Sequence, residues 1–248
     1  MDLGIKGDIA VVTGGARGIG AGIVRGLAAE GAKVVIWDRD LEPAEELASE
    51  LVAAGHEAFA VRGDVASGEE VRQVIAGVVE RFGGLHILVN NAGFSLDGPI
   101  TEMTDEQWDR VNGVCLKGVF NTCRAAAPTM IAQAYGRIVN IASRAVVGDV
   151  NKSNYSAAKA GVVGFTRALS QELGRHAITV NAIGPGLIHT DRVKTTPFYA
   201  DLDRRAREMT PIQRPGLPED IADAVLYFAS RRTGFVSGEM LFVTGGRH

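Results

Sequence analysis

The sequence has little cysteine, and its two cysteines are not placed as a functional pair. Seven residues separate Cys115 from Cys123, so the two form no CxxC motif, and they match no metal-binding motif. We therefore expect no metal site. A reduced, cytoplasmic setting is the natural one for such a chain, with both thiols packed as small apolar side chains.

Charge and hydropathy exclude two further classes of protein. The net charge is −3 over 248 residues, and the basic residues form no stripe, so nucleic acid is not an expected partner. No stretch approaches the roughly 20 apolar residues that a membrane helix needs. Residues 1–7 lack the basic and apolar regions of a secretion signal. The sequence therefore predicts a protein that acts neither on nucleic acid nor in a membrane.

What the sequence does contain is a regular alternation of short apolar runs and helix-like segments. The runs predict strands buried on both faces, as in a parallel sheet, over Ile9–Thr13, Lys33–Asp38, Glu57–Arg62, His86–Asn90, Arg137–Ala142, Thr179–Ile183 and Met240–Val243. The predicted helices cover Ala21–Glu30, Glu42–Ala54, Glu69–Phe82, Asp105–Ala134, Asn154–Gly174 and Pro218–Ser230. Glycines suited to ending a helix follow three of them, at Gly31, Gly55 and Gly83. This alternation predicts one α/β domain over residues 1–248, a doubly wound Rossmann sheet of seven parallel strands with helices on both faces.

A glycine-rich turn follows the first predicted strand and opens a helix. It runs from Thr13 to Gly20, with glycines at 14, 15, 18 and 20. Glycines at this point let the backbone approach a pyrophosphate, which the unpaired N–H groups of the helix bind. A glycine-rich turn alone is weak evidence, but its place between strand and helix favours a dinucleotide site.

An acid ends the second predicted strand, close to the spacing expected for a group that binds the adenosine ribose. That acid is Asp38, and its carboxylate would accept hydrogen bonds from the ribose hydroxyls and repel a 2′-phosphate. We therefore expect NAD rather than NADP as the cofactor. Arg17 and Arg39 argue mildly for NADP, since either could meet a phosphate.

Tyr155 and Lys159 lie four residues apart at the start of a predicted helix, so both side chains share one face. A free phenol titrates near pH ~10, too high for a good base at neutral pH. A neighbouring ammonium favours the phenolate. The pair therefore predicts that Tyr155 transfers a proton with the help of Lys159, although such a pair by itself is common on helix surfaces.

Two further polar residues support this prediction. Ser143 follows the strand Arg137–Ala142, and the carboxyl ends of strands face the ligand crevice in a doubly wound sheet. A hydroxyl there can donate to a developing alkoxide. Asn112 lies inside a predicted helix, where asparagine is disfavoured unless it has a local partner. Alternatively, Asn112 is simply an exposed helix residue, and Ser143 is a turn residue or a helix cap.

Taken together, these motifs resemble the short-chain dehydrogenase/reductase family, along nearly the whole chain. The matching residues are the turn Thr13–Gly20, Asp64-Val65, Asn90-Asn91-Ala92-Gly93, Asn112, Ser143, Tyr155 with Lys159, Pro185-Gly186 with Thr190, and Gly238 with Gly245-Gly246. The resemblance implies that Ser143 orients the substrate oxygen, Tyr155 exchanges its proton, Lys159 binds the nicotinamide ribose and Asn112 holds a relay water.

The resemblance also implies a cofactor-binding set and an assembly. The expected cofactor-binding residues are Gly14, Arg17, Gly18, Ile19, Gly20, Asp38, Asp64, Val65, Asn91, Ala92, Gly93, Tyr155, Lys159, Pro185, Gly186, Ile188 and Thr190. Family members are commonly tetramers joined through the two long helices and the C-terminal segment, so a homotetramer is expected. The chain departs from many relatives in three places: Ala142 replaces a second serine, the step from Ser143 to Tyr155 is one residue shorter, and no acid precedes Gly245.

The stretch 187–216 lacks strand character, and in this architecture it is expected to be a lid or substrate loop. A mixed, mostly apolar pocket is expected, lined by Ser95, Leu96, Ala145, Val146, Val150, Asn151, Leu187 and the loop around Phe198 and Tyr199. One of the cations Arg144, Lys152, Arg192 and Lys194 could meet an anionic substrate group. The favoured alternative is that all four are solvated, since loop cations are mostly exposed.

We therefore expect an NAD(H)-dependent oxidoreductase that interconverts a secondary alcohol and a ketone on a small molecule. A rival within the family is a 3-oxoacyl-carrier-protein reductase, which would usually use NADPH and show basic residues to its acidic carrier. Asp38 and the absence of a basic cluster in residues 132–136 speak against it. A rival of another class is a non-catalytic dinucleotide-sensing protein on the same fold. The complete set of Tyr155, Lys159, Ser143 and Asn112 speaks against that one.

Overall fold

Seven parallel strands form one sheet in the order β3-β2-β1-β4-β5-β6-β7. The computed structural model describes residues 2–190, 195 and 199–247, without the side chain of residue 205. The strands are β1 (Ile9–Thr13), β2 (Lys33–Asp38), β3 (Ala58–Arg62), β4 (Ile87–Asn90), β5 (Gly136–Ile141), β6 (Ile178–Pro185) and β7 (Met240–Val243). The expected doubly wound sheet is confirmed, and every strand lies within two residues of its predicted bounds.

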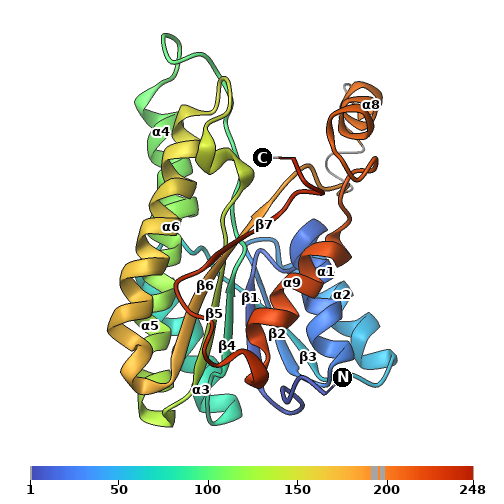
Figure 1. Cartoon of the computed structure of the whole chain (residues 1–248). Coiled ribbons are helices and arrows are strands. Elements are labelled where there is room, and N and C mark those ends of the chain that lie inside the picture. The colour runs from blue at the N-terminus through green and yellow to red at the C-terminus, as the bar shows by residue number, and fades with distance from the viewer. Residues whose placement is uncertain (1, 191–194, 196–198, 248) are drawn as a thin grey trace.

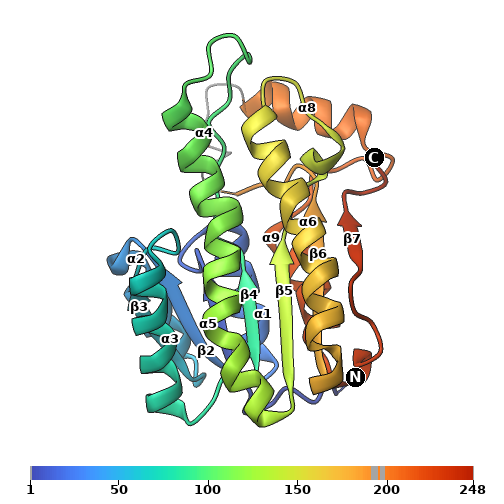
Figure 2. The ribbon, with the colours of Figure 1, turned by 90° about the vertical axis from the view of Figure 1, so that its left-hand side faces the viewer.

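Helices cover both faces of this sheet (Figure 1). The helices are α1 (Gly18–Ala29), α2 (Leu41–Ala53), α3 (Gly68–Phe82), α4 (Asp105–Asn112), α5 (Gly118–Gln133), α6 (Ser153–Leu173), α8 (Tyr199–Met209) and α9 (Pro218–Ala229). The apolar sides of α1, α2 and α9 pack on one face of the strands, and those of α3, α5 and α6 pack on the other. Helix α8 lies across the end of the molecule at which the strands finish (Figure 2). None of the described helices is both long and apolar enough to cross a membrane.

The glycines expected to end helices do so. Gly31, Gly55 and Gly83 follow α1, α2 and α3 with φ of +81°, +90° and +79°, a left-handed backbone that glycine adopts without a steric cost. At the other end of α3, the Ser67 hydroxyl accepts from the Glu70 amide at 3.3 Å and caps the helix. These local signals therefore mark where the helices begin and end.

The structure corrects three details of the expected architecture. Not every strand is buried on both faces, because β3 and β7 form the edges of the sheet and are partly exposed. The long helix expected over 105–134 is interrupted after Asn112 by a π turn, η1 (Gly113–Lys117). The expected substrate loop contains the helix α8, whose mostly charged sequence lacks the apolar runs of most other helices. The expected pocket residue Phe198 and the cations Arg192 and Lys194 lie outside the described residues.

A buried polar network joins the two central strands to the helices behind them. The Asn90 amide donates to Asn140 Oδ1 at 2.8 Å, and the Asn140 amide donates to Thr166 Oγ1 at 2.9 Å. Thr122 Oγ1 donates to Asn90 Oδ1 at 2.6 Å. All four side chains are at most 2% exposed. Because Asn90 and Asn140 are register partners in β4 and β5, the network locks these strands to α5 and α6.

We expect Asn140→Leu to lower the free energy of unfolding by about 2–4 kcal/mol, because it leaves buried polar groups of Asn90 and Thr166 unpaired. Thr166→Val removes only one acceptor from the network and should cost about 1–2 kcal/mol. Urea unfolding at one fixed protein concentration measures both. An unchanged midpoint for Asn140→Leu would contradict the structural role given to this network.

Candidate active site

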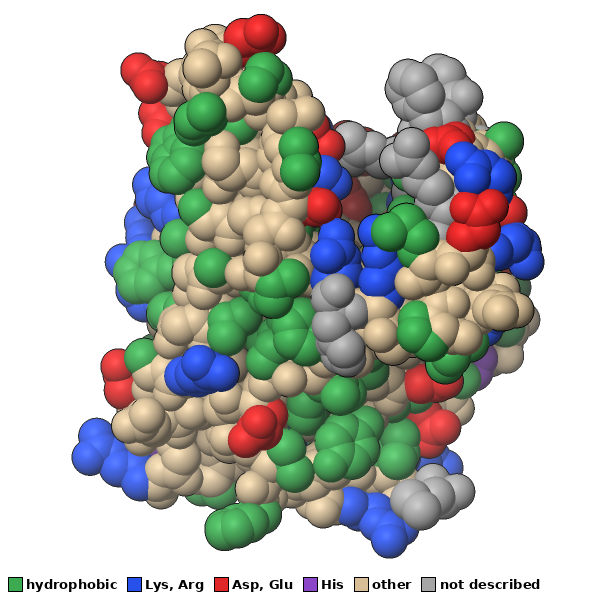
Figure 3. Space-filling model, turned by 45° about the horizontal axis from the view of Figure 1, so that its top comes forward, with side chains coloured by type: hydrophobic (Ala, Val, Ile, Leu, Met, Phe, Trp, Pro, Cys, Tyr) green, Lys and Arg blue, Asp and Glu red, His purple; other side chains and the backbone are tan. Residues whose placement is uncertain are grey.

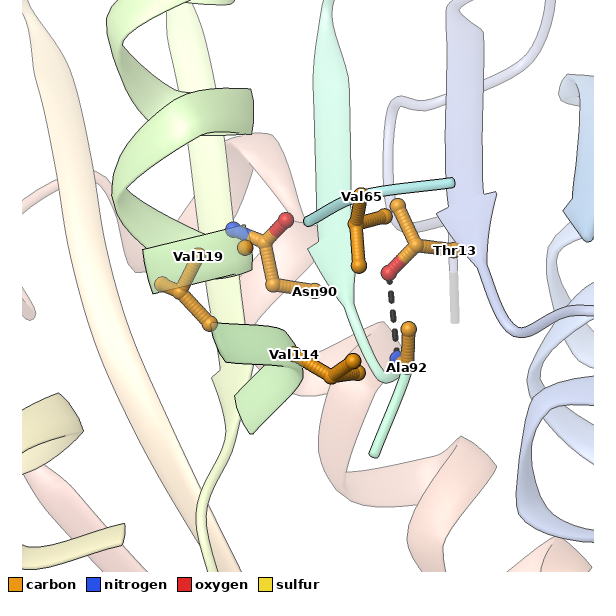
Figure 4. Close-up of a pocket in the computed structure, with 7 residues that line it drawn as sticks. Thr13, Val65, Asn90, Ala92, Val114 and Val119 are labelled. Atoms are coloured by element: carbon orange, nitrogen blue, oxygen red, sulfur yellow. Dashed lines mark hydrogen bonds between the residues drawn. The ribbon is translucent and has the colours of Figure 1, made fainter. Parts of the chain in front are cut away.

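The crevice expected to receive the dinucleotide lies where β1 and β4 are neighbours. The connections from these two strands lead to opposite sides of the sheet, which leaves an opening at their carboxyl ends. Figure 4 shows a small hollow at this point, lined by Thr13, Val65, Asn90, Ala92, Val114, Gly118 and Val119. Thr13 Oγ1 accepts from the backbone N–H groups of Asn91 and Ala92, each at 3.1 Å. The end of β1 and the segment after β4 are thereby joined across the opening.

The glycine-rich turn packs so closely against this junction that two of its glycines have no substitute. Gly14 has a φ of +60°, and its carbonyl accepts from Asn91 Nδ2 at 2.8 Å. A Cβ on Gly20 would lie 2.0 Å from the same Gly14 oxygen and 2.7 Å from Asn91 Nδ2. Any side chain at residue 20 would therefore force the turn away from Asn91.

The first turn of α1 is left open to an anion. Arg17 occupies the N-cap position without a side-chain capping bond, and the first turn, which includes Gly18 and Ile19, holds no acid. The unpaired N–H groups and the helix dipole at such an end attract a negative charge. Thr190 lies against the turn, since its Cγ2 would be 3.1 Å from a Cβ on Gly18. These residues fit the pyrophosphate of a dinucleotide.

Backbone N–H groups hold the Asp38 carboxylate beside the glycine-rich turn. Its Oδ2 accepts from the Ala16 amide at 3.1 Å and its Oδ1 from the Asp40 amide at 3.2 Å. Arg17 forms an ion pair with Asp40 at 3.3 Å, and both side chains are more than half exposed. The carboxylate of Asp38 is therefore held as an acceptor, while the guanidinium of Arg17 already faces a second carboxylate.

The segment after β3 forms another wall of the crevice. Asp64 Oδ1 accepts from the Ala66 amide at 2.8 Å, and Val65 is only 6% exposed. Asn121, a buried residue of α5, donates to the Val65 carbonyl at 3.0 Å. Sequence reasoning did not single out Asn121, although it carries the signal used for Asn112, an asparagine inside a helix.

The end of β6 leads into the expected substrate loop. Gly186, which follows Pro185, donates to the Val243 carbonyl at 2.9 Å. Ile188 is 5% exposed and pairs with Gly216, so the two ends of the loop lie together. A cavity of about 180 Å³ lies beside this junction. Its lining comes from residues 186–188, 210, 212, 214, 216, 220, 223 and 243–245.

Ser143 and Lys159 converge at the carboxyl end of β5. Lys159 is 2% exposed, and its Nζ donates to the carbonyl of Ile141 at 2.6 Å, two residues before Ser143. Ser143 Oγ accepts from the Ala145 amide at 3.1 Å, which leaves its own proton free for another acceptor. The ammonium bond therefore fixes the helix α6 against the strand that presents the serine.

Tyr155 completes this group from the first turn of α6. The ammonium of Lys159 lies 5.6 Å from the centre of the Tyr155 ring. The phenol is half-buried beside Val111, Cys115 and Ala158, and its hydroxyl forms no hydrogen bond with a described residue. Lys159 has no carboxylate partner in the described part of the chain. A buried cation of this kind calls for an acceptor that a ligand or the phenolate would supply.

The segment after β4 connects the crevice to this group. A Cβ on Gly93 would lie 3.3 Å from Lys159 Nζ and 3.2 Å from Cys115 Sγ. The backbone from Asn91 through Ala92 to Gly93 thus passes from the glycine-rich turn directly to the ammonium. Both cysteines are buried and free, as expected, and burial raises the pKa of the Cys123 thiol to about 12. Both side chains are at most 1% exposed, so solvent does not reach either thiol.

Asn112 is the last residue of α4, immediately before the π turn η1. Its Nδ2 donates to the Trp108 carbonyl at 2.9 Å, one turn earlier in the helix. This leaves the side-chain oxygen for another partner. Single π turns often mark functional positions in helices. The local partner expected for a helical asparagine is therefore present, and the relay water stays a prediction.

The residues expected at the substrate differ in exposure. Ser95 and Leu187 are half-buried, Ala145 is 3% exposed, Val150 is 84% exposed and Asn151 is exposed. Arg144 begins a short 3-10 turn, η2 (Arg144–Val147), with only 19% of its side chain exposed. Figure 3 looks onto this end of the molecule, where side chains of both charges gather around a hollow between the parts that carry α6 and α8. Contact of these residues with a substrate stays a prediction.

The chain is similar in sequence and in fold to many known proteins. A family model described as enoyl-(acyl carrier protein) reductase matches residues 14–248. The chain is 40% identical to (2S)-[(R)-hydroxy(phenyl)methyl]succinyl-CoA dehydrogenase subunit BbsD of Thauera aromatica, over 99% of this chain and 98% of that protein. It is 39% identical to the 3-oxoacyl-[acyl-carrier-protein] reductase FabG of Staphylococcus epidermidis, over 96% and 98%.

The fold of the chain also matches solved structures. The crystal structure of a putative gluconate dehydrogenase from Agrobacterium tumefaciens superposes with a TM-score of 0.95 at 33% identity, over 99% of this chain and 98% of that one. The match in sequence and fold therefore extends over the whole described chain. The protein belongs to the short-chain dehydrogenase/reductase family of NAD(P)-binding oxidoreductases.

Proposed function

We propose that this protein interconverts a secondary alcohol and a ketone on a small molecule, with NAD(H) as its cofactor and Tyr155 as its acid/base. The observation that carries the proposal is the buried ammonium of Lys159. Its bond to Ile141, its place beside the Tyr155 ring and its position 3.3 Å from where a Cβ on Gly93 would lie bring three segments to one point. Those segments are the helix with the phenol, the strand that leads to Ser143 and the loop from the dinucleotide crevice.

The nicotinamide supplies or accepts the hydride when it is bound. In the direction of ketone reduction, Ser143 would donate its free proton to the substrate oxygen and hold that oxygen beside the phenol. Tyr155 would deliver its hydroxyl proton to the same oxygen, and Lys159 would stabilise the phenolate left behind. Asn112 would hold a water that restores the proton. The half-buried setting of Tyr155 would limit the access of bulk water to this exchange.

The choice of NAD rests on Asp38. Two backbone amides hold its carboxylate at the lip of the turn, where a 2′-phosphate would meet a fixed negative charge. Arg17 is engaged by Asp40 and would have to leave that pair to meet a phosphate. These contacts support NAD over NADP.

A second candidate is the reduction of a 3-oxoacyl group on a carrier protein or a related thioester. The similarity to a FabG protein and to a CoA-thioester dehydrogenase favours it. The chemistry at the substrate oxygen is the same in both cases, so the site residues keep their roles. A panel that contains simple ketones, a 3-oxoacyl thioester and an enoyl thioester, each with NADH and NADPH, separates these candidates.

Changing Tyr155 to Phe should lower kcat by about 10²–10⁴-fold, because the proton-transfer group is lost, while NAD binding survives. Tyr227→Phe removes the same hydroxyl from a half-exposed tyrosine of α9 and should leave kcat unchanged. Absorbance of NADH and titration calorimetry give the two readouts. Retained turnover in Tyr155→Phe would overturn the assigned role and favour a non-catalytic protein.

Changing Asp38 to Ala should raise the ratio of kcat/KM for NADP to that for NAD by about tenfold or more, since one desolvated charge contact is worth this much. Glu42→Ala removes an exposed acid near the start of α2 and serves as the matched control. Steady-state kinetics with both cofactors measure the ratio. An equal ratio in Asp38→Ala and the parent protein would refute the explanation of the ribose site.

We also propose a homotetramer. Apolar side chains are exposed on α5, where Phe120 and Ile131 are 40% and 37% exposed, and on the C-terminal segment, where Phe235 and Leu241 are 104% and 39% exposed. A second copy on each surface would cover them. Light scattering should then give four times the chain mass, and the double variant Phe235→Asp, Leu241→Asp should give a smaller species. Val52→Asp, at an exposed site on α2, should not. A monomeric parent protein would contradict the proposal.

A further inference from the structure

Arg144 is mostly buried but poorly paired. It follows Ser143 directly, and its side chain is only 19% exposed. Its one charged neighbour is Asp149, whose Oδ2 lies 3.1 Å from a single terminal nitrogen of the guanidinium. Within the described residues, the remaining N–H groups of Arg144 have no hydrogen-bond partner. None of these nitrogens is buried without a partner, so the free N–H groups of Arg144 remain accessible from outside. They can therefore donate to an acceptor that a ligand supplies.

Other arginines of the chain show what a purely structural pairing looks like. Arg214 binds both oxygens of Asp220 at 2.6 and 2.7 Å. Arg137, which is 5% exposed, donates to the carbonyls of residues 136, 177 and 230. Each of these guanidinium groups uses several N–H groups on the protein. Arg144 does not, although it is the residue that directly follows Ser143 in the chain.

The neighbouring cation, Lys152, has the opposite character. Its Nζ lies 3.5 Å from Asp97 and 4.0 Å from Asp149, so two carboxylates neutralise it. Asp149 is thus shared between the two cations. Arg144 therefore keeps N–H groups that can bind a ligand, whereas the charge of Lys152 is already balanced by carboxylates of the protein.

The surroundings of Arg144 are held in place by backbone and side-chain bonds. The Gly98 amide donates to the Asn151 carbonyl at 2.8 Å, and Asn154 Nδ2 donates to the Leu96 carbonyl at 2.9 Å. These bonds tie the loop after β4 to the loop that carries Asp149 and Lys152. A guanidinium anchored in such a frame can hold a ligand group at a set distance from Ser143.

We propose that Arg144 binds a carboxylate carried by the substrate, so that the enzyme acts on oxo- and hydroxycarboxylates in preference to neutral ketones and alcohols. The inference rests on the proposed function and narrows its substrate class. The planar fork of a guanidinium matches a carboxylate. Asp149 remains beside it and repels a doubly charged phosphate more than a singly charged carboxylate.

The test compares acids with their methyl esters in the cofactor-loaded protein. The substrates are 3-oxobutanoate, 4-oxopentanoate and 5-oxohexanoate, each paired with its methyl ester, and NADH oxidation is followed. For at least one chain length we expect kcat/KM of the acid to exceed that of the ester by about tenfold to a hundredfold, the range of a charge-assisted hydrogen bond. Arg144→Gln should remove this preference, mainly through a higher KM for the acid.

Two further variants keep the result interpretable. Lys152→Gln removes the other cation of the cluster and should retain the preference for the acid. Asp149→Asn removes the competing carboxylate from Arg144 and should strengthen the preference. Equal kcat/KM for acids and esters at every chain length, or a preference that survives in Arg144→Gln, would overturn the inference while leaving the proposed function intact. Failure to reduce any ketone of either panel would instead overturn the proposed function.

Discussion

The joint between the ends of β1 and β4 is the contact on which the rest of the site depends. The Thr13 hydroxyl accepts hydrogen bonds from two backbone amides, and the side-chain amide of Asn91 donates to the carbonyls of Thr13 and Gly14. Any parallel sheet opens where its connections diverge, and an opening without such bonds would leave polar backbone groups unpaired. Here the same groups set the path of the glycine-rich turn and the direction of the segment toward Lys159.

From this joint, a continuous series of contacts reaches the residues proposed for catalysis. Gly93 leaves space beside the ammonium of Lys159 that a Cβ would narrow to 3.3 Å, the ammonium binds the end of β5, and β5 leads to Ser143. Helices α5 and α6 are held against the sheet by the buried amides of Asn90 and Asn140, which keeps these contacts in place. Buried polar groups that are fully paired give a rigid framework, so the positions of the reacting groups follow from the core of the protein.

The sequence predicts the strands, the helix ends and the motif residues well, but it does not predict which distant side chains are hydrogen-bonded to one another. The strands, the helix-ending glycines, Asp38 and the Tyr155–Lys159 pair were accessible because each has a local signature in spacing or residue type. Asn140, Asn121 and the partner of Lys159 were not, because their roles depend on which strand or helix lies opposite, and that is a long-range property. The π turn after Asn112 was missed for a related reason: its residues fit an ordinary helix, and only tertiary packing selects the wider turn. For Arg144, the sequence alone offers four loop cations of equal standing. Of the two that lie within the described residues, Arg144 has the less exposed side chain, at 19% against 32% for Lys152.

The π turn has a consequence for how this protein can change over time. One residue advances an α-helix by about 100°, so an extra residue accommodated in η1 sets the rotation of α5 relative to α4. Asn112 before the turn and Thr122 after it are thereby oriented independently: the first donates to the Trp108 carbonyl, and the second donates into the core at Asn90. Loss of a single residue from 113–117 would bring these two orientations into conflict. Insertions and deletions should therefore be tolerated in the loops above the sheet but rejected within this one turn of helix.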